Sequence, residues 1–419
     1  MRHNIPVERL GVQGVAMATT VENCVHCGLC LPACPTYQLL GQEMDSPRGR
    51  IMLMKTALEG NLSVEEVRPF VDKCLGCLSC DTVCPSDTHY GEMLLSFRAY
   101  TEEKGARRKL SESLLRSLAV ETMSHPTRFR IAALLGTLMR PLRALLPYRL
   151  SSMLDLLPPM LPTPTRFPEI TPAEGERRAR VTLLTGCVQS VLSPGINRAA
   201  VRVLARNGVE VLVPHGQGCC GALAMHVGNA RKARALARRN MHVFHADVDA
   251  IITTAAGCGS GISEYNLLFG DARDCNLAVE FAAKVRDVHV FLDDLGLCAR
   301  FGKTQAQRLT YHDACHLANA QGIKQAPRRL LQQVPELELV QLDEVEMCCG
   351  SAGIYNIEQP ELADQLGSRK AAVVLKSGAA GLVSGNIGCI TQIGAHLRSS
   401  GNDMPVLHTM EVLDHAYNS

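Results

Sequence analysis

The chain has 419 residues, of which 46% are hydrophobic and 20% charged, and its formal net charge at pH 7 is +2. This composition is typical of a globular protein with two or three domains, and the balanced charge argues against a nucleic-acid partner. No apolar run reaches the roughly 18–20 residues of a membrane span, so we expect any membrane contact to be peripheral. Eighteen cysteines in a long chain without a basic-then-apolar leader indicate a reducing cytosol, with thiolates reserved for metal.

Residues 1–23 are predicted to form a short leader, and two cysteine runs of one spacing, C-x2-C-x2-C-x3-C-P, follow it. Two-cluster bacterial ferredoxins have this spacing, and in them the fourth cysteine of each run binds the other cluster. Two [4Fe–4S] clusters are favoured over two zinc sites. A zinc ion needs only two pairs of cysteines, so the third C-x2 step and the C-P end of each run would have no role in a zinc site. Cluster 1 is assigned to Cys24, Cys27, Cys30 and Cys84, and cluster 2 to Cys34, Cys74, Cys77 and Cys80.

Helices rather than strands are expected between the two runs. An apolar stretch over 51–58 suits a short helix, and a second helix is expected over 63–71, with Ser63 as its N-cap. The sequence therefore predicts a helical two-cluster ferredoxin domain over residues 1–100.

A connector is predicted over residues 101–177. Its first part, 101–150, has ten Lys or Arg against four Glu on helical sequence with apolar patches. Such a pattern fits an amphipathic surface for anionic lipid or an acidic partner, but a solvated helical connector is slightly favoured. Six prolines over 156–172 indicate a linker.

From residue 178 onward, strands alternate with helices, and the pattern occurs twice. This alternation predicts parallel sheets with helices on both faces. The fold class is therefore α+β multidomain, with the helical ferredoxin domain followed by two Rossmann-like α/β domains over 178–300 and 301–419. The expected strands are 180–185, 209–213, 249–254, 308–312, 337–340 and 381–384, and the expected helices are 195–206, 229–244, 327–333 and 360–376.

Each α/β copy carries four cysteines that follow its strands, two of them in a Cys-Cys-Gly doublet. Between the copies these cysteines are offset by 128, 129, 129 and 131 residues. Loops after parallel strands meet at one sheet edge, so four thiols should converge in each copy or at the junction between copies. For these repeated cysteines we favour a metal or redox site over a role as small buried hydrophobic residues. For Cys275 and Cys298, which have no counterpart in the other copy, we favour the role as small buried hydrophobic residues. A third site is assigned to Cys187, Cys219, Cys220 and Cys258, and a fourth to Cys315, Cys348, Cys349 and Cys389.

Several other residues invite a functional interpretation. The loop 216–221 matches G-x-G-x-x-G, but nucleotide binding is disfavoured because the second copy keeps the cysteine doublet and not the glycines. Arg48 and Arg50 are candidates for tuning a cluster potential or docking a partner, with surface salt bridges as the alternative. Five histidines near the cysteines are expected to be ordinary loop residues, His316 being the best ligand candidate among them: His215, His226, His312, His316 and His408.

The two C-P runs, the sequence SPRGR at 46–50 and the two Cys-Cys-Gly repeats together resemble the iron–sulfur subunits of membrane-associated oxidoreductases, over nearly the whole chain. This group includes the glycolate oxidase iron–sulfur subunit, the anaerobic glycerol-3-phosphate dehydrogenase small subunit and heterodisulfide-reductase-like proteins. The sequences YHDACH at 311–316 and GNIGC at 385–389 favour the first of these.

The resemblance implies that a separate FAD-containing subunit oxidises glycolate to glyoxylate. This chain would then hold no catalytic residue and would pass electrons through the two clusters towards quinone. It would act in the cytoplasm, peripherally bound to the inner face of the cytoplasmic membrane. Gly261 and Gln392 stand where the heterodisulfide reductase pattern has a further cysteine, so a four-cysteine iron–sulfur cluster, a zinc site or an empty site all remain open for each repeat.

Three rival interpretations remain from the sequence. The hydroxy acid could be D-lactate, or the substrate glycerol-3-phosphate, since those systems use the same kind of subunit. The chain could be a self-contained redox enzyme whose Cys-Cys-Gly sites reduce a disulfide or a quinone. It could also be a non-catalytic subunit that anchors a complex to lipid through the basic segment 101–150.

Overall fold

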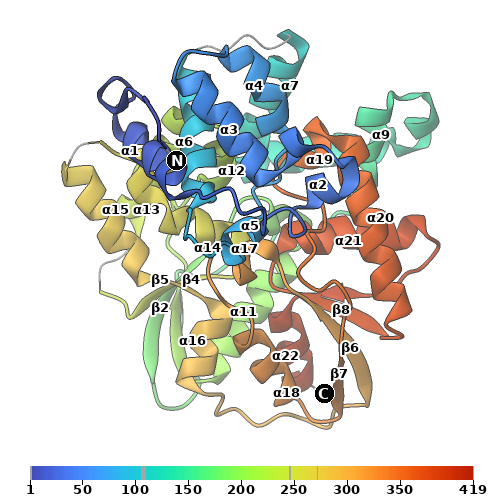
Figure 1. Ribbon diagram of the computed structural model, residues 1–419. Coiled ribbons are helices and arrows are strands. Elements are labelled where there is room, and N and C mark those ends of the chain that lie inside the picture. Colours follow the sequence, from blue (N-terminus) through green and yellow to red (C-terminus); the bar gives the residue numbers. More distant parts are fainter. Residues whose placement is uncertain (1, 105–109, 245–246, 271, 419) are drawn as a thin grey trace.

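The computed structural model describes residues 2–104, 110–244, 247–270 and 272–418. Figure 1 shows a helical N-terminal part lying against two α/β units, whose sheets stand side by side. Three of the basic residues counted in the connector, Arg107, Arg108 and Lys109, lie outside the described residues.

The described residues of the N-terminal part form helices joined by loops and no strand, as the sequence predicts. The two helices expected between the cysteine runs are present, and Ser63 caps the second of them: its hydroxyl accepts from the N–H of Glu66 at 3.3 Å, and its own N–H donates to Oε2 of Glu66 at 2.8 Å. The elements are η1 (Val7–Arg9), α1 (Val12–Asn23), α2 (Pro35–Leu40), η2 (Glu43–Asp45), α3 (Pro47–Leu58), α4 (Val64–Asp72), α5 (Ser79–Thr82) and α6 (Tyr90–Glu103).

Residues 1–23 were expected to form only a short leader. This prediction is wrong for the second half of the stretch, which forms α1. Met17 and Val21 lie four residues apart on one face of this helix and are fully buried, in the same core as Met93 and Phe97 of α6. This helix therefore belongs to the core of the ferredoxin part.

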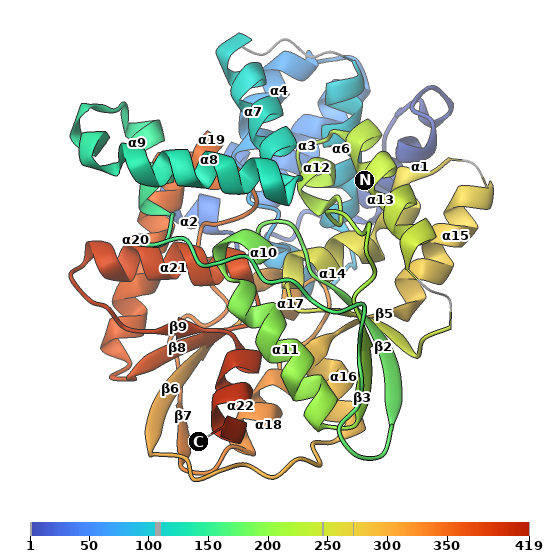
Figure 2. The ribbon, with the colours of Figure 1, turned by 180° about the vertical axis from the view of Figure 1, so that it is seen from behind.

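In its described residues the connector forms three helices and a short 3-10 turn that pass over the outside of the molecule. Figure 2 shows α8 lying across the outer face and α9 projecting from the body. Within the proline-rich linker, a short strand, β1 (Ile170–Thr171), pairs antiparallel with the first α/β sheet. The connector elements are α7 (Leu110–Met123), α8 (Pro126–Met139), η3 (Arg140–Leu145) and α9 (Tyr148–Asp155).

The first α/β unit has the sheet order β1-β3-β2-β4-β5, and all strands except β1 are parallel. Its three predicted strands and two predicted helices are present. The strands are β2 (Ala179–Leu184), β3 (Val209–Leu212), β4 (Ala250–Thr253) and β5 (Val285–Asp287). The helices are α10 (Gln189–Leu192), α11 (Pro194–Arg206), α12 (Ala222–His226), α13 (Ala230–Val243), α14 (Ala256–Ser263), η4 (Tyr265–Leu268), α15 (Ala272–Lys284) and α16 (Val288–Leu295).

The second unit repeats this topology, since its parallel sheet has the order β7-β6-β8-β9. The predicted fold class, a helical ferredoxin part followed by two repeated parallel-sheet units, is therefore confirmed. The strands are β6 (Gln307–His312), β7 (Leu337–Val340), β8 (Gly381–Ser384) and β9 (Val406–Leu407). The helices are α17 (Cys315–Ala318), α18 (Ala326–Gln332), α19 (Tyr355–Glu358), α20 (Pro360–Lys376), α21 (Ile387–Ser399) and α22 (Thr409–Asn418).

The last helix, α22, joins the two units because it packs against α11 of the first one. Arg202 Nε donates to Asp414 Oδ1 at 2.8 Å, and Asn207 Nδ2 donates to the hydroxyl of Tyr417 at 3.2 Å. The two repeats thus share one interior. Among the helices that the structure describes, none is both long enough and apolar enough to cross a bilayer.

Candidate metal centres

The first of three cysteine-lined cavities lies between the loop after α1 and the loop after α5, and its volume is about 30 Å³. Cys27 is exposed, and Cys30 and Cys84 are half-buried, so this site lies near the surface. The cavity is lined by the four cysteines assigned to cluster 1, Cys24, Cys27, Cys30 and Cys84, together with Cys80.

The second cavity, of about 20 Å³, lies deeper in the protein. Gly76 adopts a φ of +65° in the loop that forms it, and its N–H donates to Sγ of Cys74 at 3.4 Å. The cavity is lined by the four cysteines assigned to cluster 2, which are all buried: Cys34, Cys74, Cys77 and Cys80. The structure thus brings together the two predicted groups of four, whereas their ligation of iron stays a prediction.

The thiols of both sites fit a metal cluster by their chemistry. None of these eight cysteines forms a disulfide. Burial raises the pKa of Cys24 and Cys30, and it raises the pKa of Cys77 and Cys80 well above the usual range. A buried thiolate needs a positive partner, and iron bound in place of the proton provides one.

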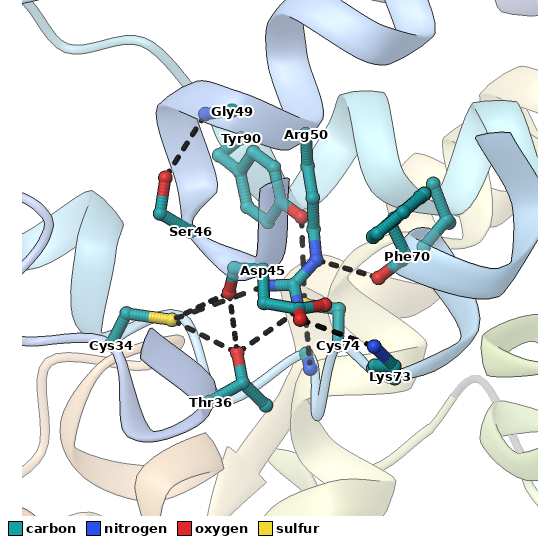
Figure 3. A network of polar contacts seen from close by, with 12 residues as sticks. Cys34, Thr36, Asp45, Ser46, Gly49, Arg50, Phe70, Lys73, Cys74 and Tyr90 are labelled. Atoms are coloured by element: carbon teal, nitrogen blue, oxygen red, sulfur yellow. Dashed lines mark hydrogen bonds and ion pairs between the residues drawn. The ribbon is translucent and has the colours of Figure 1, made fainter. Parts of the chain in front are cut away.

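Arg50 lies beside the second site and is completely buried (Figure 3). Its Nε donates to the carbonyl of Phe70 at 2.7 Å and its Nη2 to the hydroxyl of Thr36 at 3.0 Å. Its Nη1 lies 3.9 Å from Sγ of Cys34. A guanidinium is always charged in proteins, so this places a full positive charge at the second set of thiols.

Asp45 is the nearest counter-charge to this guanidinium, at 3.7 Å, and it is bound in turn by Lys73 at 3.1 Å. Arg48 contrasts with Arg50: its side chain is 32% exposed, its Nε donates to Glu43 at 2.6 Å, and it lines the first cavity. Arg50 is therefore a buried charge at the second site, whereas Arg48 is a salt-bridged residue at the rim of the first.

The third cavity lies between the two α/β units and has a volume of about 420 Å³. We call it the eight-thiol cavity. Apolar residues of α7, α8 and the α9 region form another part of its wall, among them Leu118, Ala133 and Leu157. All the cysteines of the two Cys-Cys-Gly repeats line it: Cys187, Cys219, Cys220, Cys258, Cys315, Cys348, Cys349 and Cys389. Both sets of four therefore converge at the junction between the copies.

The thiols of the first repeat form two close pairs in this cavity. The sulfur atoms of Cys187 and Cys219 are 3.3 Å apart, and so are those of Cys220 and Cys258. Their chemistry fits a soft metal or an iron–sulfur cluster, because thiolates are the ligands that such centres prefer. Whether they hold one stays a prediction.

In the second repeat a histidine joins the thiols. Ligand atoms of His312, Cys349 and Cys389 all lie within 4.8 Å of one another, and all three residues are buried. Burial, aided by the nearby charge of Lys370, lowers the pKa of His312 to about 3, so its ring is neutral and can bind a metal. His312 was expected to be an ordinary loop residue, and it instead adds a nitrogen to this donor set.

Two more histidines, His226 and His316, line the eight-thiol cavity with their rings 5.1 Å apart. His316 Nδ1 lies 2.6 Å from the hydroxyl of Ser260. Burial lowers the pKa of His316 to about 4 and raises the pKa of Glu264, which lies 4.0 Å from His226, to about 7. Two histidines that can carry protons therefore line a cavity whose wall is largely apolar.

The remaining sequence candidates lie away from the cavities. His215 is exposed, and His408 is buried against the ring of His289. The expectation that Cys275 and Cys298 are buried small hydrophobes is wrong for Cys298, which is exposed because it follows the end of α16 in an open loop. Cys275 is half-buried and packs on the core of the first unit.

The second site and the eight-thiol cavity are in contact. Cys77 shares one buried group with Cys348 and Leu75, and Cys315 packs against that group. Asn319 fixes this junction by donating from Nδ2 to the carbonyl of Cys77 at 2.9 Å. No sequence signal points to this contact or to the connector helices in the cavity wall, because both depend on packing between distant segments.

Comparisons with known families agree with this arrangement. Residues 20–88 match the 4Fe-4S dicluster domain, and residues 181–263 and 309–394 each match the cysteine-rich domain. Together with the two groups of four thiols, these matches establish two [4Fe–4S] clusters as the cofactors of the N-terminal part.

Relatives match along most of the chain. A probable glycolate oxidase iron–sulfur subunit of Bacillus subtilis is 35% identical over 90% of this chain and 89% of its own length. The glycolate oxidase iron–sulfur subunit of Escherichia coli is 35% identical over 97% of each chain. A subunit of the fumarate reductase (CoM/CoB) of Methanothermobacter marburgensis is 26% identical over 98% of this chain and 76% of its own.

The fold also resembles a solved structure. A hypothetical protein from Helicobacter pylori matches with a TM-score of 0.53 and 9% identity, over 84% of this chain and 64% of that one. At this identity the likeness concerns the fold alone.

Proposed function

The chain belongs to the family of glycolate oxidase iron–sulfur subunits, and on that premise we propose that it is the electron-transferring subunit of a complex that oxidises glycolate to glyoxylate. A partner subunit with FAD would take two electrons from the hydroxy acid, so this chain needs no acid–base residue for that step. When bound, the two [4Fe–4S] clusters supply one-electron carriers between the flavin and a final acceptor.

The observation that carries the proposal is the order in which the three sets of thiols lie. The first set is near the surface, where a partner subunit can reach it, and Cys27 is exposed there. The second set is buried and touches the eight-thiol cavity through Cys77, Cys315 and Cys348. This order supports a path from a partner at the surface to an acceptor in the interior.

We propose a membrane quinone as that acceptor, taking two electrons and two protons to become the quinol. The eight-thiol cavity supports this assignment, because its volume of about 420 Å³ and its apolar wall suit a quinone ring. His226 and His316 supply polar groups at the same place. The proposal places the protein in the cytoplasm, peripherally bound to the inner face of the cytoplasmic membrane.

The test is glycolate-driven reduction of a water-soluble quinone analogue by the complex with its flavin subunit. Cys27→Ala and Cys77→Ala should each abolish quinone reduction and leave glycolate-driven bleaching of the flavin unchanged, since they remove one predicted ligand of each cluster. Cys298→Ala is the matched control, because this cysteine is exposed and lines none of the three cavities.

Other outcomes would change the assignment. Quinone reduction that survives in both cluster variants would overturn the role in electron transfer. Turnover by this chain without any flavin subunit would favour the self-contained redox enzyme. Flavin bleaching by D-lactate or glycerol-3-phosphate and not by glycolate would change the substrate and keep the role of this chain.

A further inference from the structure

We propose that residues 131–150 form a membrane-docking surface that inserts into the headgroup region of an anionic bilayer. The surface runs along the outer side of α8, through η3 and into α9. It deepens the proposed function, because a lipid-soluble acceptor requires a bilayer at a defined face of the protein. Its large apolar side chains are Ile131, Leu134, Leu135, Leu138, Met139, Leu142, Leu145, Tyr148 and Leu150.

The first argument is the concentration of exposed apolar side chains. Of the twenty large hydrophobic side chains that are exposed among the described residues, nine fall in this stretch of twenty residues. Leu138 is 75% exposed and Leu145 is 81% exposed. η3 has no buried residue at all. Exposed apolar patches of this kind mark a site of interaction with a protein or a membrane.

The second argument is that these side chains are held outward. The inner side of α8 is already packed, since Ala133 forms a buried group with Leu154 and Leu157. Arg130 on α8 and Arg140 directly after this helix hold it in place by donating to the carbonyls of Pro162 at 2.9 Å and Pro159 at 3.0 Å. The leucines on the outer side therefore have no interior to turn into.

The third argument is charge, and it selects lipid as the occupant. Residues 131–150 have three arginines, Arg140, Arg143 and Arg149, and no acidic residue, so the segment carries +3, although Arg143 also pairs with Asp155 just beyond it at 2.6 Å. The whole chain carries +2, so all other residues together carry 2 − 3 = −1. Arginines interleaved with exposed leucines are typical of helices that lie in the plane of an anionic membrane surface.

Length and position agree with insertion parallel to the surface. α8 has 14 residues, fewer than the roughly 20 that span a bilayer. Figure 2 shows it lying across the outer face, with α9 projecting beside it. Phe129, Ala132 and Gly136 on its inner side line the eight-thiol cavity, so one helix separates the proposed bilayer from that cavity.

The experiment measures binding of the iron-loaded full chain to vesicles of equimolar phosphatidylglycerol and phosphatidylcholine by co-sedimentation. We expect Leu138→Glu/Leu145→Glu to weaken binding at least about 100-fold, because burial of each leucine is worth about a factor of ten or more. The control Val15→Glu/Val279→Glu changes two valines that are 62% and 53% exposed outside the segment, and it should bind like the wild type. Arg149→Glu should weaken binding to these vesicles and not to pure phosphatidylcholine.

Iron content is recorded for the same samples, and glycolate-driven reduction of a water-soluble quinone analogue is recorded for the same variants in complex with the flavin subunit. These readouts should stay unchanged in the leucine variant, so a failure of docking is distinguished from a failure of the proposed electron transfer. The inference is overturned if the wild type does not bind vesicles or if both double variants bind equally well. It is also overturned if the leucine variant keeps vesicle binding and instead loses its flavin subunit, since the surface would then be a protein interface.

Discussion

The two cluster sites share one pattern of cysteines and differ in their surroundings. The first has an exposed cysteine, Cys27, and a half-exposed arginine, Arg48, that is paired with Glu43. The second has four buried cysteines and a fully buried arginine, Arg50. The difference teaches that a repeated motif places the thiols, whereas the non-repeated packing around them sets the electrostatics of each site.

The difference in charge between the two sites predicts the direction of electron flow between the clusters. Arg50, Asp45 and Lys73 together leave one net positive charge beside the second site, where Arg50 and Asp45 are buried and Lys73 is 30% exposed. A nearby positive charge stabilises the reduced cluster, which carries the additional electron. We therefore expect Arg50 to raise the potential of cluster 2 and to favour electron flow inward, from the surface site to the buried one.

Removal of a cysteine is the largest change and tests whether the two sites are separate. Cys27→Ala and Cys77→Ala should each lose about four of about eight iron atoms of the N-terminal part, because each cluster needs four thiolates. Iron analysis of both variants, with Cys298→Ala as the control, measures this loss. Loss of all eight iron atoms from either variant would show that the sites fold as one unit, and it would contradict the view that they are separate.

Removal of the buried charge tests the predicted difference in potential. Arg50→Met should lower the potential of one cluster by about 100 mV, since one charge at about 6 Å is worth about 2–3 kcal/mol at a dielectric constant near 20. Redox titration followed by low-temperature EPR reports it. Asp45 is not left unpaired in this variant, because Lys73 still binds it at 3.1 Å.

Arg48→Met is the matched control, two residues away on the same helix. Its charge is balanced by Glu43 and screened by water, so the potential of cluster 1 should move far less. Arg50→Lys, which keeps the charge, should hold cluster 2 near its original potential. Equal shifts in the Arg48 and Arg50 variants would contradict the electrostatic account.

The pH dependence of cluster assembly should sharpen the comparison further. Burial raises the pKa of Cys77 and Cys80 more strongly than that of Cys24 and Cys30, so protons compete harder with iron at the second site. As the pH falls from about 9 to about 6, anaerobic reconstitution should fail at the second site first. Cys77→Ala and Cys27→Ala report one site each, and identical pH profiles would speak against unequal burial.

The smallest expected effect comes from the helix N-caps, and it distinguishes the stability of the fold from the potentials of the clusters. Ser46 caps α3, which carries both arginines, and its hydroxyl accepts from the N–H of Gly49 at 3.1 Å. Ser46→Ala and Ser63→Ala should each lower the free energy of unfolding by about 1 kcal/mol. Denaturant titration measures this, and neither cluster potential should move. A shifted potential in Ser46→Ala would mean that the cap positions Arg50.

The sequence predicts what depends on local spacing. It predicts both groups of four thiols, the strands of each repeat and the convergence of the Cys-Cys-Gly cysteines, because parallel strands end at one edge. It treats Arg48 and Arg50 alike, although residues two apart on α3 point to different sides of the helix. The sequence does not predict that α22 packs on α11 or that α8 forms part of the cavity wall. Both contacts join segments that are distant in the sequence, so no local pattern predicts them.

The most direct test of the electron-transfer role is low-temperature EPR of the anaerobically purified complex before and after glycolate is added. The account predicts that glycolate bleaches the flavin and that a reduced [4Fe–4S] signal appears in this chain, first from the cluster with the higher potential. If glycolate fully reduces the flavin while the clusters stay oxidised, although dithionite reduces them, this chain does not receive the electrons of glycolate.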